Sequence, residues 1–259
     1  MSFSADWLAL RSDADRRARN PALAADLAEA LFDTDPLQVL DLGSGTGANL
    51  AALAPLFGLA QRWVLVDNDA RLLAHVHSQP GVALDRRIVD LADDLEGLFD
   101  PRPDLVTASA FFDLAGSAWI DRLVDGVVEA EAAFYTVLTY DGREDWAPGH
   151  DLDADVLAGF KADQHRDKGL GPALGPDATA HLAQAFRAAS YQVQTAPSDW
   201  QLTRAEDGAL ISALAEGSAA AVADRLGAEQ AAEWQTARSN AESVMIGHLD
   251  LLALPLPRA

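Results

Sequence analysis

The segment Leu37–Gly47, which reads LQVLDLGSGTG, decides the fold of this chain. It begins with the branched apolar residues typical of a buried strand and ends with three alternate glycines, Gly43, Gly45 and Gly47. The helix-forming run ANLAAL, residues 48–53, follows at once. A strand, a glycine turn and a helix start predict the point where an open α/β sheet brings backbone N–H groups against a nucleotide-like ligand. Glycine is required because a Cβ atom would obstruct both the turn and the ligand.

Two ligand classes use this geometry. The pattern Gly43-x-Gly45-x-x-Ala48 satisfies the dinucleotide fingerprint, and Asp67 lies roughly 20 residues further on, where that fingerprint places a ribose-binding acid. Asp41 argues against a dinucleotide, because a carboxylate at the strand end would repel a pyrophosphate. It suits S-adenosylmethionine, which carries an ammonium and a sulfonium but no phosphate. The remaining alternative is an ordinary strand–turn–helix whose glycines serve packing only.

Composition excludes several other classes. The chain has 259 residues, with 40 acids against 19 Lys and Arg and a formal net charge of −21. This charge disfavours nucleic acid and anionic lipid as partners, although a local basic cluster could still hold a small anion. The absence of cysteine excludes disulfides, a thiol nucleophile and cysteine metal ligands. With no apolar run near the ~20 residues of a membrane helix and no signal peptide at residues 1–7, we expect a cytoplasmic protein.

Strand and helix patterns alternate after an N-terminal pair of helices, which indicates a mainly parallel, doubly wound α/β sheet. The predicted strands are 37–42, 62–67, 82–89, 104–109, 132–140, 191–203 and 244–252. The predicted helices are 4–19, 21–32, 47–57, 69–77, 93–99, 117–130, 153–165, 176–189, 206–225 and 228–240. We expect a single domain over 1–259, with a helical lid at 1–34, a cofactor-binding half at 35–140 and substrate-side insertions with the C-terminal strands at 141–259.

The segment Val39–Gly47 resembles the first motif of the class I S-adenosylmethionine-dependent methyltransferases. The order of elements resembles that family from Leu37 to Leu254. The resemblance implies a Rossmann-like sheet of about seven strands whose last strand is antiparallel, with N-terminal helices and helical insertions. Strands 191–203 and 243–252 would then form the closing hairpin.

The resemblance also implies a cofactor site at the carboxyl ends of the strands. Asp41 would face the cofactor's ammonium, Asp67 would accept from both ribose hydroxyls, and Asp90 would accept from the adenine amino group. Asp67 could instead cap the next helix, although Asp69 is the better cap. Ser109 and Ala110 would lie beside the methyl group, with Phe111 or Phe112 as a pocket wall. The complete predicted set is Asp41, Gly43, Ser44, Gly45, Gly47, Asp67, Asn68, Asp90, Leu91, Ser109 and Ala110.

The acceptor side is less well defined. We predict Tyr140 at the strand rim and His150 or His165 as a general base, because a histidine pKa lies near neutrality. Lys161, His165, Arg166 and Lys168 form a basic cluster that either orients an anionic acceptor or belongs to a solvated helix, and Lys161 and His165 would share a helix face. The first helix, with Trp7, Leu8 and four arginines, is either solvated or a lid. The pair His75 and His77 is interpreted as incidental, and no spacing indicates a metal site.

The sequence therefore predicts a methyltransferase that acts on a small-molecule acceptor by in-line transfer. A nicotinamide-dependent oxidoreductase and a non-catalytic S-adenosylmethionine-binding protein remain the alternatives. The acceptor atom, the need for a base, and the choice between monomer and homodimer stay open.

Overall fold

The computed structural model describes residues 4–58 and 60–256. Its centre is an eight-stranded sheet in the order β3-β2-β1-β4-β5-β8-β6, with β7 paired to β8. The strands are β1 (Leu37–Leu42), β2 (Gln61–Asp67), β3 (Val82–Ile88), β4 (Leu105–Ser109), β5 (Ala133–Ala147), β6 (Tyr191–Pro197), β7 (Trp200–Thr203) and β8 (Ser243–Pro255).

Strand direction confirms the predicted fold class. Strands β1 to β5 pair in parallel, whereas β8 runs antiparallel to both β5 and β6. One detail of the prediction was wrong. The stretch 191–203 is two strands rather than one, because the chain leaves β6 at Pro197 and re-pairs with β8 only from Trp200. The described sheet consequently has eight strands, in agreement with the prediction of about seven.

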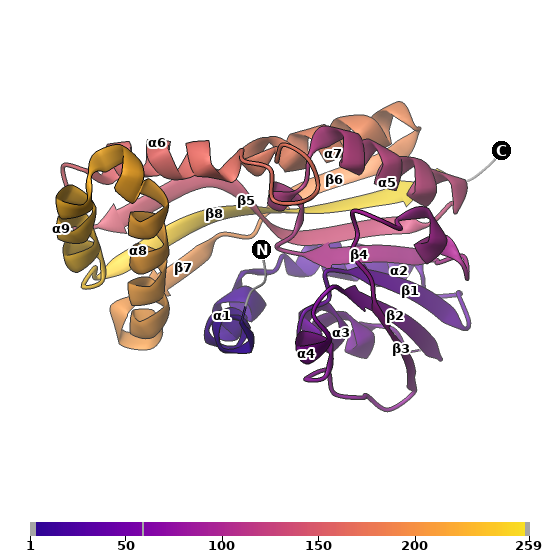
Figure 1. Ribbon diagram of the computed structural model, residues 1–259. Coiled ribbons are helices and arrows are strands. Elements are labelled where there is room, and N and C mark those ends of the chain that lie inside the picture. Colours follow the sequence, from indigo (N-terminus) through magenta and orange to yellow (C-terminus); the bar gives the residue numbers. More distant parts are fainter. Residues whose placement is uncertain (1–3, 59, 257–259) are drawn as a thin grey trace.

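Helices cover both faces of the sheet (Figure 1). They are α1 (Ala5–Ala18), α2 (Pro21–Ala30), α3 (Ala48–Leu53), α4 (Ala70–Leu73), α5 (Ser117–Glu129), α6 (Asp153–Gln164), α7 (Ala178–Ala188), α8 (Arg204–Leu226) and α9 (Ala228–Arg238), with short 3₁₀ turns η1 (Ala54–Leu56), η2 (Glu96–Phe99), η3 (Phe112–Leu114) and η4 (Gly175–Asp177). Within the described ranges, no helix has the length and apolar character needed to span a bilayer.

Alternate side chains of the central parallel strands enter two separate cores, whereas the edge strand β3 contributes only Val82 and Leu84, to one of them. In β1, Leu37 and Val39 pack with α2 and α3, whereas Leu40 and Leu42 pack on the opposite face with α5 and α7. Both faces are buried because successive side chains of a strand point to opposite sides. The sheet is thus a rigid support, and its carboxyl-end loops are free to form a site.

Strand β5 is longer than predicted. It continues to Ala147 through register shifts against β8, and at the first shift Leu138 has φ +59°. The carboxylate of Asp250 accepts a hydrogen bond from the Leu138 backbone N–H at 2.8 Å, which supports this unusual conformation. The β5–β8 ribbon therefore extends past the parallel strands and carries α6, α8 and α9 (Figure 1). Tyr140 consequently lies inside a strand, not at the rim of the sheet.

Candidate functional site

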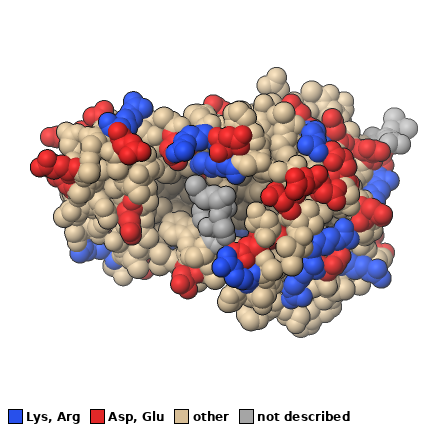
Figure 2. All heavy atoms as spheres, in the orientation of Figure 1, with Lys and Arg blue, Asp and Glu red and all other residues tan. Residues whose placement is uncertain are grey.

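A cavity of about 890 Å³ lies at the carboxyl ends of the parallel strands. Its walls come from the glycine loop after β1, the loops after β2, β3 and β4, helix α1, and residues 168–170. Figure 2 shows a hollow in the middle of one face, with basic side chains gathered along its upper edge, where α6 ends in Figure 1. A cavity at this edge is where open α/β sheets bind their ligands.

Every residue predicted to contact the cofactor lines this cavity, namely Asp41, Gly43, Ser44, Gly45, Gly47, Asp67, Asn68, Asp90, Leu91, Ser109 and Ala110. They come together because parallel strands all end at one edge of the sheet, so each strand brings the loop that follows it to that edge.

The glycine loop forms the turn that its sequence predicts. Gly43, Gly45 and Gly47 have φ values of +59°, +53° and +87°, which side chains with a Cβ rarely adopt. The carboxylate of Asp67 accepts hydrogen bonds from the N–H of Gly45 at 2.8 Å and from the N–H of Asp69 at 2.9 Å. Asp69 caps α4 by accepting from the Arg71 N–H, as expected. Asp67 therefore already orients the loop.

Asp41 is buried beneath this loop, with only 1% of its surface exposed. One carboxylate oxygen, Oδ1, accepts a hydrogen bond from Asn49 Nδ2 at 3.1 Å. The other, Oδ2, has no partner among the described residues. Burial raises the pKa of Asp41 to about 7, against the opposing effect of the bond from Asn49. A buried acceptor without a donor is costly, so this oxygen points to a donor from a ligand.

Arg19 stands next to this carboxylate and was missed by the sequence analysis. It follows α1 and donates to Asn49 Oδ1 at 2.8 Å and to Ser109 Oγ at 3.3 Å. Burial lowers the pKa of the Arg19 guanidinium, an effect that nearby Tyr135, Asp15, Asp250 and Asp41 oppose. No described carboxylate forms an ion pair with it, so its hydrogen-bond partners are neutral groups.

Helix α1 is a wall of the site rather than a solvated helix. Leu8, Arg11, Ser12, Asp15 and Arg19 line the cavity. Their three- and four-residue spacing places them on one helix face, which is the only signal in the sequence that could have revealed Arg19. The lid interpretation is therefore the one that the described part of α1 supports, and residues 1–3 of the predicted lid lie outside the described residues.

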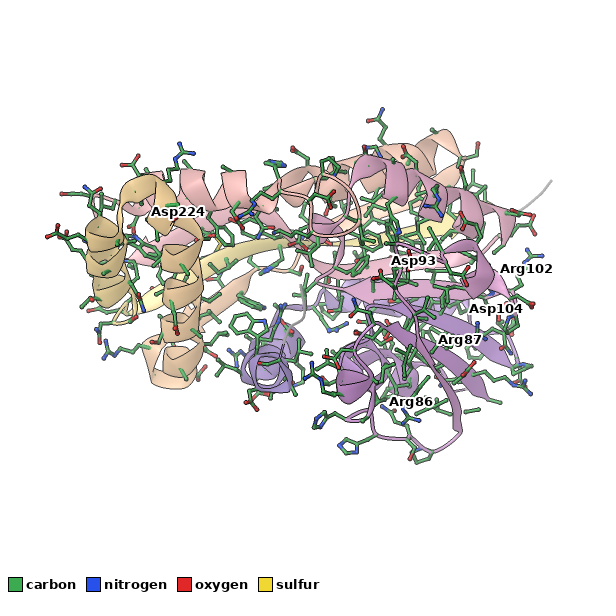
Figure 3. All side chains as sticks on the ribbon, viewed as in Figure 1. Arg86, Arg87, Asp93, Arg102, Asp104 and Asp224 are labelled. Atoms are coloured by element: carbon green, nitrogen blue, oxygen red, sulfur yellow. The ribbon has the colours of Figure 1, made fainter. Side chains whose placement is uncertain are left out.

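The loop after α4 forms another unexpected wall. The predicted helix 69–77 ends at Leu73, so the exposed side chains of His75 and His77 lie on the loop that follows it, where they line the cavity. Arg86 of β3 holds this loop by donating to the carbonyl oxygens of Leu73 at 3.2 Å and Val76 at 2.9 Å (Figure 3). The pair, which was interpreted from the sequence as incidental for metal binding, is thus part of the cavity wall.

The loop after β4 closes the cavity on the side of the expected methyl group. Ala110 has φ +52°, and its N–H donates to the Val137 carbonyl at 2.9 Å. Such left-handed conformations are costly outside glycine and concentrate at functional sites. Phe111 lines the cavity, whereas Phe112 is fully buried in the core, so a single phenylalanine forms the wall.

The three predicted catalytic side chains are not brought to this cavity. Tyr140 is buried and donates its hydroxyl proton to Glu144 Oε1 at 2.8 Å. His150 accepts from the Leu152 N–H through Nδ1 at 3.2 Å, and His165 Nδ1 contacts the Ala173 carbonyl at 3.1 Å. Of the predicted basic cluster, Lys168 lines the cavity, whereas Lys161, His165 and Arg166 do not. Among the described residues, no cluster of three or more His, Asp or Glu is arranged to hold a metal ion.

No protein-family model matches the chain, and no curated protein matches it in sequence. Several solved structures match it in fold. A cyclopropane-fatty-acyl-phospholipid synthase-like protein from Lactobacillus casei ATCC 334 aligns with a TM-score of 0.53 and 14% identity, over 96% of this chain and 94% of that one. The cyclopropane synthase MmaA2 from Mycobacterium tuberculosis aligns with a TM-score of 0.51 and 11% identity, over 96% and 94%.

A candidate type II methyltransferase from Anaeromyxobacter dehalogenans aligns with a TM-score of 0.51 and 20% identity, over 91% of this chain and 97% of that one. The chain has the Rossmann-like methyltransferase fold. At these identities the similarity establishes the fold, and the activity has to be argued from the cavity itself.

Proposed function

We propose that this protein is an S-adenosylmethionine-dependent methyltransferase that acts on a small-molecule acceptor, with residues 1–259 as a single domain. The observation that carries the proposal is the pairing of two unsatisfied charges in one cavity. Among the described residues, Asp41 has a buried oxygen without a donor, and Arg19 has a half-buried guanidinium without an ion pair. A ligand that presents both an ammonium and a carboxylate satisfies both groups at once.

The residues present fit the amino-acid end of S-adenosylmethionine. Asp41 would accept from its ammonium, and Arg19 would donate to its carboxylate, each as a charge-assisted hydrogen bond. The glycine loop borders the same cavity, and the φ values of Gly43 and Gly45 favour glycine. A pyrophosphate, by contrast, would meet the Asp41 carboxylate.

The remaining predicted residues fit the nucleoside end. The Asp67 carboxylate accepts from two backbone N–H groups in the ligand-free protein. It would accept from the two ribose hydroxyls in addition to these donors or in place of them. Asp90 accepts from the Ala92 N–H through Oδ1 at 3.0 Å, which leaves Oδ2 for the adenine amino group. Leu91, whose carbonyl is fixed by Trp119 Nε1 at 2.7 Å, would pack on the ring.

When bound, S-adenosylmethionine supplies a methyl group on a sulfonium, which an acceptor displaces in line. The chain's part is alignment and exclusion of water. Ser109, Ala110 and Phe111 would border the transferring methyl, and α1 would cover it from the opposite side. Because Tyr140, His150 and His165 lie outside the cavity lining, we assign none of them to proton transfer, and an acceptor that is already deprotonated needs no base.

Calorimetric titration tests the proposal. S-adenosylhomocysteine should bind the protein, and NAD should bind at least a hundredfold more weakly. Asp41→Asn and Arg19→Met should each weaken S-adenosylhomocysteine and leave the affinity for 5′-methylthioadenosine, which lacks the amino-acid end, unchanged. Tighter binding of NAD than of S-adenosylhomocysteine would refute the cofactor. Binding without methyl transfer to any member of a broad metabolite panel would favour a non-catalytic binding protein.

A further inference from the structure

The acceptor end of the cavity has a mixed lining. Leu8 of α1, Phe111, Leu114 and Leu170 supply apolar surface, and Lys168 supplies a positive charge. Phe111 and Leu114 follow Ser109 and Ala110 along the chain, and Leu170 pairs with the backbone at Ala115 and Gly116. A molecule that occupies this end therefore meets a largely apolar wall with one lysine.

The loop that carries Lys168 is held firmly against the start of α5. The Gly116 N–H donates to the Leu170 carbonyl at 3.0 Å, and the Leu174 N–H donates to the Ala115 carbonyl at 2.9 Å. A Cβ at Gly116 would stand 2.8 Å from the Leu170 oxygen, so the two backbones are in close contact. Lys168 is consequently presented from a fixed backbone rather than from a loose surface loop.

The ammonium of Lys168 has no strong partner. Its Nζ donates to the neutral Gln164 Oε1 at 3.2 Å, and no described carboxylate forms an ion pair with it. Burial lowers the pKa of Lys168, an effect that the more distant Asp113 and Asp163 oppose. Asp163 is already paired with Arg166 at 3.1 Å, and Asp113 is buried, where burial raises its pKa to about 6.

The other charges at this end are largely compensated. Arg11 holds both oxygens of Asp15, at 2.9 and 3.1 Å, and its guanidinium lies over the Trp200 ring at 4.8 Å. Arg16 is paired with Asp13. Arg19 also lacks an ion pair, but the proposed function assigns it to the cofactor's carboxylate. Among the described lysines and arginines of the wall, Lys168 is then the one whose charge is left for the acceptor, in a chain whose net charge of −21 otherwise repels anions.

We propose that Lys168 binds the carboxylate of the methyl acceptor, whose apolar body packs against Phe111, Leu114 and Leu170. A single negative charge fits better than a phosphate dianion, because one lysine faces the ligand and Asp15 and Asp113 lie nearby. The substrate class is then a small carboxylate with an aromatic or aliphatic body. This inference rests on the proposed methyltransferase function and names the acceptor for the same cavity.

The test uses the full chain saturated with S-adenosylhomocysteine. Benzoate and hexanoate are titrated as probes, with the neutral benzamide and hexanamide as their matched analogues. The carboxylates should bind the wild type more tightly than the amides do. Lys168→Met should weaken the carboxylates about tenfold or more, the usual effect of losing a bond to a charged group, and leave the amides unchanged. Lys168→Arg should restore most of the carboxylate affinity.

Lys161→Met is the matched control, since the chain has two lysines and Lys161 does not line the cavity. It should leave all four affinities unchanged. The two lysines also allow a direct readout: benzoate should protect Lys168, and not Lys161, from acetylation by an amine-reactive reagent followed by peptide mass spectrometry.

The outcomes separate the two proposals. If S-adenosylhomocysteine does not bind the wild type, the proposed function fails and the acceptor proposal falls with it. If S-adenosylhomocysteine binds, but the carboxylates bind no better than the amides or bind equally to Lys168→Met, then the role of Lys168 is refuted and the methyltransferase proposal stands. Unchanged S-adenosylhomocysteine affinity in Lys168→Met shows that the variant is folded.

Discussion

Replacing Asp41 with Asn is expected to stabilise the ligand-free protein and to weaken cofactor binding at the same time. Asn has nearly the same shape and retains an oxygen that can accept the hydrogen bond from Asn49 Nδ2. It removes the buried negative charge, which lowers the stability of the ligand-free fold but strengthens the binding of a cationic group. The substitution therefore separates the effect of this charge on the free energy of unfolding from its effect on ligand affinity.

The magnitude follows from the raised pKa. Burial moves the pKa of Asp41 from 3.8 to about 7, a difference of about three pKa units, which corresponds to about 4 kcal/mol. As pH rises, the Asp41 carboxyl ionises in the unfolded chain before it ionises in the folded protein, so ionisation favours the unfolded chain above pH 3.8. The loss of stability grows from there and is complete once the folded carboxyl also ionises, above about pH 7. Below pH 3.8 both states are protonated, and the cost disappears.

Urea unfolding followed by tryptophan fluorescence measures this cost. The free energy of unfolding of Asp41→Asn should exceed that of the wild type by about 0.5 kcal/mol at pH 4, about 3 kcal/mol at pH 6 and about 4 kcal/mol at pH 8. Asp13→Asn, at an exposed acid paired with Arg16, is the control and should change stability by less than about 1 kcal/mol. A difference that is independent of pH, or an Asp41→Asn protein less stable than the wild type at pH 8, would refute the reasoning.

Binding should change in the opposite direction. Loss of the charged acceptor should weaken S-adenosylhomocysteine by about 1.5–3 kcal/mol, or roughly ten- to a hundredfold. The wild-type affinity should also fall as pH drops below 7, because the protonated Asp41 no longer attracts an ammonium, and the Asn variant should show a flatter pH profile. Equal pH profiles for the two proteins would mean that Asp41 does not face the ligand's ammonium.

Three further substitutions test other parts of the cavity. Asp67→Ala should weaken S-adenosylhomocysteine by about 1.5–3 kcal/mol in calorimetry and also destabilise the glycine loop, since Asp67 accepts from the Gly45 N–H. Normal affinity in a folded variant would show that Asp67 does not bind the cofactor. Gly45→Val should abolish binding, because φ is +53° and a Cβ there would lie 3.0 Å from Leu8 Cδ1. Retained binding would make this glycine a packing residue. Arg19→Met should weaken S-adenosylhomocysteine at least tenfold; an unchanged affinity would leave Arg19 a structural bridge between Asn49 and Ser109.

The sequence by itself determined the strand–glycine–helix turn and the set of residues at the strand ends. Asp41, Asp67, Asp90 and Ser109 could be placed on one edge because parallel strands all end at the same side of a sheet. The three alternate glycines predicted a tight turn because a Cβ atom would obstruct it, and their positive φ values agree with that turn. These inferences need only local conformation and strand order, both of which are present in the residue pattern.

The tertiary structure alone decided which residues from distant segments complete the cavity. Arg19 reaches Ser109 from the end of a helix 90 positions earlier, and its spacing from Arg11 and Asp15 indicates a shared helix face without indicating what that face covers. Lys168 rather than Lys161 faces the cavity, because the backbone of Gly116 clamps the loop after α6 in one orientation. Tyr140 left the predicted rim because β5 continues through a bulge that Asp250 stabilises. Each of these outcomes depends on a contact between segments far apart in the chain, and such contacts leave no periodicity in the sequence.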